Sequence, residues 1–173
     1  MPDLLILPLR GAGDLGNWLV AGVFNWDDTP RERVLSLDPR GLDPTQEHCL
    51  SEFWDAERWF LPTGQPLRLK AIPPHGVQLL PIRKRREAVP LRRGSTFHFS
   101  QGGEVKEWAV SDRQVRARFE LGRLGEGELE LALPAAARTA ALDHQPLAPL
   151  DLGDNIYRLA FTVDQAQALL VSC

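Results

Sequence analysis

Cysteine, excess charge and long apolar runs are all scarce in this chain, and each shortage excludes a class of protein. Two of the 173 residues are cysteine, Cys49 and Cys173. A disulfide framework needs more than two, so we expect free thiols. The 20 Lys and Arg residues are outnumbered by 23 Asp and Glu, which leaves a net charge of −3. Neutralising phosphates needs a concentrated positive face, so we expect no nucleic-acid partner.

The sequence also lacks an apolar run of the roughly 20 residues that span a membrane, so we expect no membrane partner. It shows no secretory signal, because residues 1–3 (MPD) carry no basic side chain and the apolar run 4–7 is too short. These features predict a cytoplasmic protein. A strand-like segment at 4–9 begins almost at once, which is typical of a piece of a longer protein rather than of a complete enzyme.

Motifs for metal, cofactor and nucleophile chemistry are missing as well. The histidines are His48, His75, His98 and His144. None shows the i, i+4 spacing of a helical metal pair, and no serine stands in a G-x-S-x-G elbow. The glycines of 11–13 (GAG) and 102–103 (GG) do not open a helix, as a phosphate or dinucleotide cradle would. We therefore predict no metal site and no cofactor.

Two groups of acidic residues are candidates for the paired carboxylates of a glycosidase. Asp27 and Asp28 are adjacent and precede a proline, which is typical of a turn in which Asp bonds backbone amides. Three acidic residues between 52 and 57 surround Trp54, and their pattern favours the edge of a sandwich. We predict no catalytic residue in this chain.

Turn residues and alternating segments are plentiful. The 14 Gly and 14 Pro, with few helix-like apolar periods, predict many short strands joined by turns. The apolar run 18–26 predicts a strand buried on both faces. Apolar and polar residues alternate in 115–121, 128–133 and 157–163, which places one set on a core face and the other toward water. These patterns predict an all-β fold of two antiparallel β-sandwich domains.

The clearest change in composition is a basic segment near the middle of the chain. Residues 83–86 read RKRR, and Arg92 and Arg93 follow soon after. Like charges at this density repel one another and stay solvated. We therefore predict a first β-sandwich at 1–83, a basic linker at 84–93 and a second, smaller β-sandwich at 94–173.

Three short segments of the first half occur in a characteristic order. They are FNW at 24–26, EFWD at 52–55 and PPHGVQLL at 73–80. As an ordered set within residues 17–83, they resemble the C-terminal antiparallel β-sandwich that follows the catalytic barrel in α-galactosidase-like glycoside hydrolases. The resemblance implies a non-catalytic region that packs on and stabilises a catalytic barrel of the same parent chain, absent from this sequence. In that family the catalytic aspartates lie on barrel strands, so no catalytic residue is carried over.

Tryptophan is frequent for this length. The five residues are Trp18, Trp26, Trp54, Trp59 and Trp108. Sugars present apolar C–H faces that stack on indole, so an exposed Trp beside acidic residues suits a carbohydrate-binding surface. We predict Trp59 and Trp108 as the carbohydrate-binding residues, and we expect Trp26 and Trp54 in the core, where Trp is usually found.

Two other functions remain open from the sequence. A self-standing carbohydrate-binding module would have the same fold, since sandwiches serve many functions, and it would be favoured by exposed, coplanar Trp59 and Trp108. A sandwich enzyme would need Glu104, Glu107 and His98 to converge in one pocket with shifted pKa values. Because His98 alternates with apolar neighbours on an expected strand, we expect it to face solvent instead.

Overall fold

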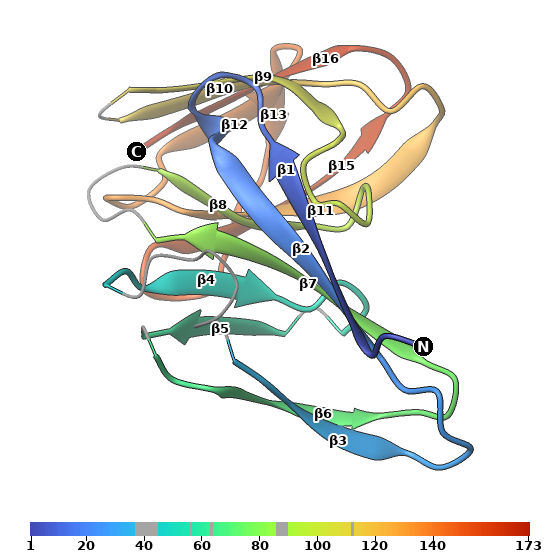
Figure 1. The fold of residues 1–173 in the computed structure, drawn as a ribbon. Coiled ribbons are helices and arrows are strands. Elements are labelled where there is room, and N and C mark those ends of the chain that lie inside the picture. Colours follow the sequence, from blue (N-terminus) through green and yellow to red (C-terminus); the bar gives the residue numbers. More distant parts are fainter. Residues whose placement is uncertain (37–44, 56, 63, 86–89, 112) are drawn as a thin grey trace. The chain divides into compact units, whose positions relative to one another are not determined.

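The computed structural model describes the chain except for residues 37–44, 56, 63, 86–89 and 112. The described part consists mainly of strands, with one short 3-10 helix, η1 (Gly13–Leu15), and no α-helix (Figure 1). The prediction of an all-β fold built from antiparallel sheets is confirmed. Within the same residues, no helix has the length and apolar character needed to cross a membrane.

The chain divides into two compact units. The first comprises Met1–Leu9 and Trp18–Arg85, and the second comprises Arg10–Asn17 and Arg86–Cys173. The segment Arg10–Asn17, which the sequence division assigned to the first half, therefore belongs with the second unit. The domain limits drawn from the sequence stay a prediction.

Two sheets form the first unit. Five strands lie in the order β1 (Leu4–Arg10), β2 (Asn17–Phe24), β7 (Val77–Lys84), β4 (His48–Ser51) and β5 (Arg58–Leu61). A two-stranded sheet pairs β3 (Arg31–Leu35) with β6 (Leu67–Ile72). The core of this unit includes Ala21, Leu50, Leu69, Ile72 and Leu80. Each of these side chains is at most 2% exposed, so the first unit has a hydrophobic core of its own.

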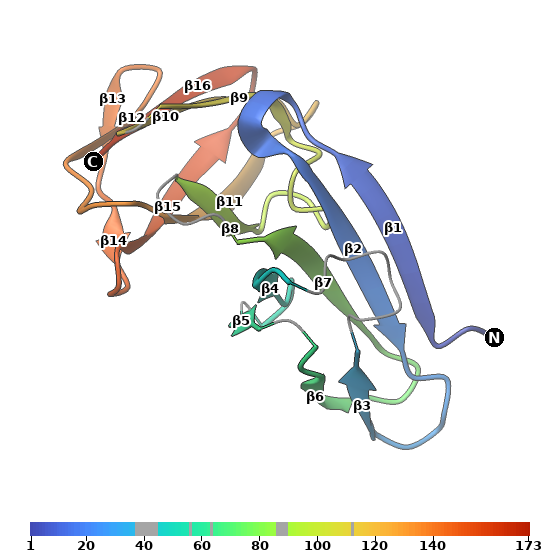
Figure 2. The same ribbon diagram turned by 60° about the vertical axis from the view of Figure 1, so that its left-hand side comes forward.

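Two larger sheets form the second unit, and Figure 2 shows them as separate layers. One has the order β13 (Gln145–Leu147), β12 (Thr139–Leu142), β16 (Gln167–Ser172), β10 (Gln114–Phe119) and β9 (Val105–Ser111). The other has the order β14 (Leu150–Asp151), β15 (Ile156–Val163), β11 (Gly125–Ala132) and β8 (Leu91–Ser95). The helix η1 adds to this unit, because the Asp14 carboxylate accepts a hydrogen bond of 2.9 Å from the Val110 N–H on β9.

Alternation along the strands builds the second core. On β10, Val115, Ala117 and Phe119 are buried. Arg116 and Arg118, which lie between them, are exposed, as the alternation predicted. Three rings meet in this core: Phe161 lies 4.7 Å from Phe97 and 5.3 Å from Phe119 between ring centroids. Gly127 makes room for them, since a Cβ atom there would lie 2.7 Å from the Phe97 ring.

Three of the basic residues around the predicted linker are buried. Arg83 belongs to β7, is 4% exposed, and places its guanidinium carbon 4.2 Å from the centre of the Trp18 ring. Arg92 and Arg93 belong to β8 and are 2% and 7% exposed. The expectation of solvated arginines is therefore wrong for these three residues. Positions 86–89 of the predicted linker lie outside the described residues.

Candidate functional site

Trp54 is the most exposed tryptophan that the structure describes, with 64% of its surface accessible. Its strand, β4, ends at Ser51, and residues 53–55 form a turn before β5 begins. A side chain at the tip of a turn has no second sheet to pack against. The expectation that Trp54 packs between the sheets is therefore wrong, and its indole is open to a ligand.

Glu52 holds this turn in place. Its side chain is 1% exposed, and its Oε2 atom accepts a hydrogen bond of 2.5 Å from the Asp55 N–H. The Glu52 N–H donates to the Glu57 carbonyl at 2.8 Å, which closes the base of the turn. The Phe53 ring meets the Trp54 ring edge-on, with centroids 4.8 Å apart and an interplanar angle of 82°. Buried anchoring beneath an exposed ring presents that ring in a defined orientation.

Charged groups of both signs lie beside the turn. The Lys70 ammonium on β6 pairs with Glu57 and lies 4.0 Å from Asp55 Oδ2. The hydrogen bond to Glu57 is the main cause that raises the pKa of Lys70 above its usual value, so the ammonium stays charged at neutral pH. Residues 52–55 and 57 with Lys70, which we name the Trp54 turn, thus combine an apolar face with hydrogen-bond donors and acceptors.

Trp26 is the other tryptophan of the described chain with an exposed ring, at 40%. One face of its indole is stacked on Phe24, with centroids 5.0 Å apart and planes 1° from parallel. Its Nε1–H donates to the Pro2 carbonyl at 2.9 Å. The expectation that Trp26 lies in the core is wrong, but its covered face and occupied N–H fit a role in anchoring the N-terminal segment.

The two predicted carbohydrate-binding tryptophans lie in different units. Trp59 on β5 is partly buried and packs on the first core. Trp108 on β9 is 3% exposed and belongs to the second core. The buried indole of Trp108 has no free face for a sugar, and Trp59 is less exposed than Trp54 and Trp26. The sequence did carry a signal for Trp54, because acidic residues flank it. Trp59 lies between Arg58 and Phe60 and has no acidic residue next to it.

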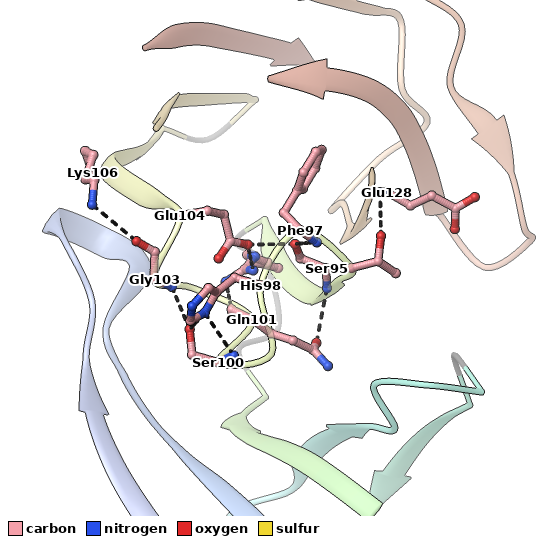
Figure 3. Close-up of polar contacts among 11 residues, drawn as sticks. Ser95, Phe97, His98, Ser100, Gln101, Gly103, Glu104, Lys106 and Glu128 are labelled. Atoms are coloured by element: carbon pink, nitrogen blue, oxygen red, sulfur yellow. Dashed lines mark hydrogen bonds and ion pairs between the residues drawn. The ribbon is translucent and has the colours of Figure 1, made fainter. Parts of the chain in front are cut away.

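A buried polar network holds the segment between β8 and β9 in the second unit. Arg92 Nη2 lies 2.5 Å from Glu104 Oε1, and the two side chains are 1% and 0% exposed. The Ser95 hydroxyl donates to the same Glu104 oxygen at 2.6 Å, and the Ser95 N–H donates to Gln101 Oε1 at 3.1 Å (Figure 3). Arg92 also donates to the Gln101 carbonyl. Burial lowers the pKa of Arg92, and the Glu104 charge opposes that shift.

The residues weighed for a sandwich enzyme have separate partners. Glu104 is bound by Arg92 and Ser95, as described. His98 Nδ1 lies 2.7 Å from the Ser100 hydroxyl, which in turn accepts from the Gly103 N–H at 2.9 Å (Figure 3). Glu107 is 70% exposed and lies 3.5 Å from Arg118. These contacts order a loop and an exposed strand pair. No group of three or more His, Cys, Asp or Glu side chains in the described ranges is placed to hold a metal ion.

Comparison with known proteins yields a remote likeness among solved structures. No protein-family model and no curated protein matches the chain. Among solved structures, the chain is similar to Arthrobacter globiformis T6 isomalto-dextranase complexed with panose, at 12% sequence identity and a TM-score of 0.36. The alignment covers 98% of this chain and 33% of that chain. The chain therefore spans about one third of the length of that protein.

Proposed function

We propose that this chain is a non-catalytic β-sandwich region that binds carbohydrate at the Trp54 turn. The observation that carries the proposal is an indole 64% exposed on a turn whose base is fixed by Glu52. The apolar C–H face of a sugar ring stacks on such an indole, and its hydroxyls pair with the neighbouring carboxylates and ammonium. The ring is already oriented by its own turn, so binding loses little conformational freedom.

Isothermal titration calorimetry tests this site with α- and β-linked oligosaccharides of galactose and of glucose. We expect saturable binding of at least one series, weakened by about fivefold in Trp54→Ala, since an aromatic contact contributes roughly 1 kcal/mol. Trp26→Ala is the matched control, because it removes the other exposed indole and leaves the Trp54 turn intact. Binding that is lost equally in both variants, or that survives in Trp54→Ala, contradicts the proposal.

We further propose that the parent protein is a glycoside hydrolase similar to α-galactosidases and that this region packs on its catalytic barrel. Strand β1 supports a packing role. Leu4 and Ile6 face the first core, whereas Leu5 and Leu7 point to the opposite face and are 52% and 50% exposed. Exposed leucines side by side on an edge strand suit burial against another protein surface.

The DNA that precedes the Met1 codon separates this proposal from a self-standing carbohydrate-binding module. A continuous frame that encodes a barrel with paired acidic residues supports the glycoside hydrolase. A stop codon in frame directly upstream contradicts it and favours the module, which needs the Trp54 turn but no barrel.

A further inference from the structure

The outer face of the sheet β13-β12-β16-β10-β9 is hollowed into a groove of about 400 Å³. Its floor consists of apolar side chains on three strands: Ala109, Ala141, Ala168 and Leu170. Their neighbours along the strands, such as Trp108 and Leu169, point into the core. Because alanine has a short side chain, these positions leave space above the sheet that a larger side chain would fill. The volume falls within the range of about 300–1,000 Å³ that is usual for small-ligand sites.

Two arginines of β10 line this groove. The register places Arg116 between Ala109 and Leu170, and it places Arg118 between Glu107 and Ala168. Arg118 shares an exposed ion pair with Glu107 at 3.5 Å. The hydrogen bond of Arg116 is to the neutral amide of Gln114 at 3.4 Å. Across the described part of the chain, no ion pair joins Arg116 to a carboxylate, so its guanidinium keeps donors that a ligand can use.

One end of the groove is fixed by the turn between β12 and β13. Asp143 and His144 both have positive φ there, 45° and 70°. The Asp143 N–H donates to the Ala168 carbonyl and its Oδ1 accepts from the Ala168 N–H, both at 2.8 Å. These bonds engage the Asp143 carboxylate with backbone. Asp143 keeps its negative charge at this end of the groove, and Arg116 and Arg118 of β10 supply the guanidinium donors along its length.

We propose that this groove binds an acidic saccharide, with the carboxylate of a uronic acid residue on Arg116 and the sugar ring over Ala168 and Leu170. The planar guanidinium fork matches a carboxylate in two-point geometry, and such charge-assisted bonds are the stronger ones. The flat apolar floor fits the C–H face of a pyranose ring. A peptide strand is less suited, because β10 and β16 are already paired on both sides and offer no free backbone groups. The site is independent of the Trp54 turn, which belongs to the first unit.

Calorimetry of the 173-residue chain in low salt tests the site with a galacturonate trisaccharide and, as its neutral counterpart, a galactose trisaccharide. We expect the acidic sugar to bind at least about tenfold more tightly than the neutral one. Arg116→Gln should weaken binding of the acidic sugar by a similar factor, since a hydrogen bond to a charged group changes the affinity by more than about tenfold. Arg123→Gln is the matched control: Arg123 is exposed in the loop that precedes β11, outside the groove, and its loss should leave the affinity unchanged.

A second variant separates the groove from general charge attraction. Ala168→Leu keeps every charge and fills the floor, so we expect it to weaken the acidic sugar as well, while Trp54→Ala leaves its affinity unchanged. The proposal is overturned if no binding is measured, if the neutral sugar binds equally well, or if Arg123→Gln weakens binding as much as Arg116→Gln. Equal binding of a triglutamate peptide would assign the groove to acidic peptides and overturn the saccharide. Loss of binding in Trp54→Ala would place the acidic sugar at the Trp54 turn.

Discussion

Arg92 and Glu104 form an ion pair of 2.5 Å whose two side chains are almost completely buried. Removing one partner of such a pair leaves a charge without compensation in a medium of low dielectric constant, which typically costs about 3–5 kcal/mol. We therefore expect Arg92→Met and Glu104→Gln each to lower the free energy of unfolding by that order. The double variant should lose clearly less than the sum of the two.

Urea unfolding of the three variants measures this coupling. The exposed pair of Arg118 and Glu107 is the control, since its side chains are 50% and 70% exposed and such pairs contribute at most about 1 kcal/mol. Equal losses in Arg92→Met and Arg118→Met would show that the buried pair is not formed in solution.

Trp54→Ala should change stability little. The indole is mostly exposed, and surface substitutions of this kind usually fall within about 0.5 kcal/mol. Leu50→Ala, four residues earlier in the core and 0% exposed, should instead cost about 2–5 kcal/mol. Thermal unfolding followed by circular dichroism compares the two. A fall in the melting temperature as large in Trp54→Ala as in Leu50→Ala would mean that the indole is buried.

Gly127→Ala should destabilise the second unit. Its new methyl group would lie 2.7 Å from the Phe97 ring, which is 4% exposed and packed against Phe161. Overpacking in a filled core costs about 1–3 kcal/mol. Adding Phe97→Leu should recover part of the loss, because the smaller side chain vacates the space that the methyl group needs. Chemical denaturation of the single and double variants measures both effects. An unchanged free energy of unfolding in Gly127→Ala would mean that the Phe97 ring rotates away at no cost.

Trypsin should spare the bonds after Arg92 and Arg93 in the folded protein. Both residues lie in β8 and are buried, whereas Arg123 lies in an exposed loop whose backbone a protease can reach. Mass spectrometry of a limited digest should therefore detect cleavage after Arg123 well before cleavage after Arg92 or Arg93. The reverse order would show that β8 opens before that loop is cut.

The chain should not hydrolyse glycosides. Two of the acidic residues weighed for catalysis are engaged elsewhere: Glu52 closes a turn, and Glu104 is bound by Arg92. Assays with aryl α- and β-glycosides measure this. Turnover that survives repurification and disappears in Glu104→Gln or Glu107→Gln would contradict it.

The sequence by itself determined the all-β class of this protein and several of its strands. Alternation is a local property, because successive side chains of a strand point to opposite faces, and it identified β10 and β15 with their buried residues. Turn residues likewise marked the ends of many strands, since their backbone preferences act over two or three positions. The all-β class follows from these local patterns alone.

Only the tertiary structure decided the burial of side chains whose position differs from what their polarity predicts. Charge density predicted solvated arginines, yet Arg92 is buried because Glu104, twelve positions away, supplies its counter-charge. Apolarity predicted a core position for Trp54, yet β4 ends at Ser51 and leaves that indole on a turn. The hollow beside Arg116 arises from alanines on three other strands. Each outcome depends on partners that are distant in sequence, which local pattern cannot specify.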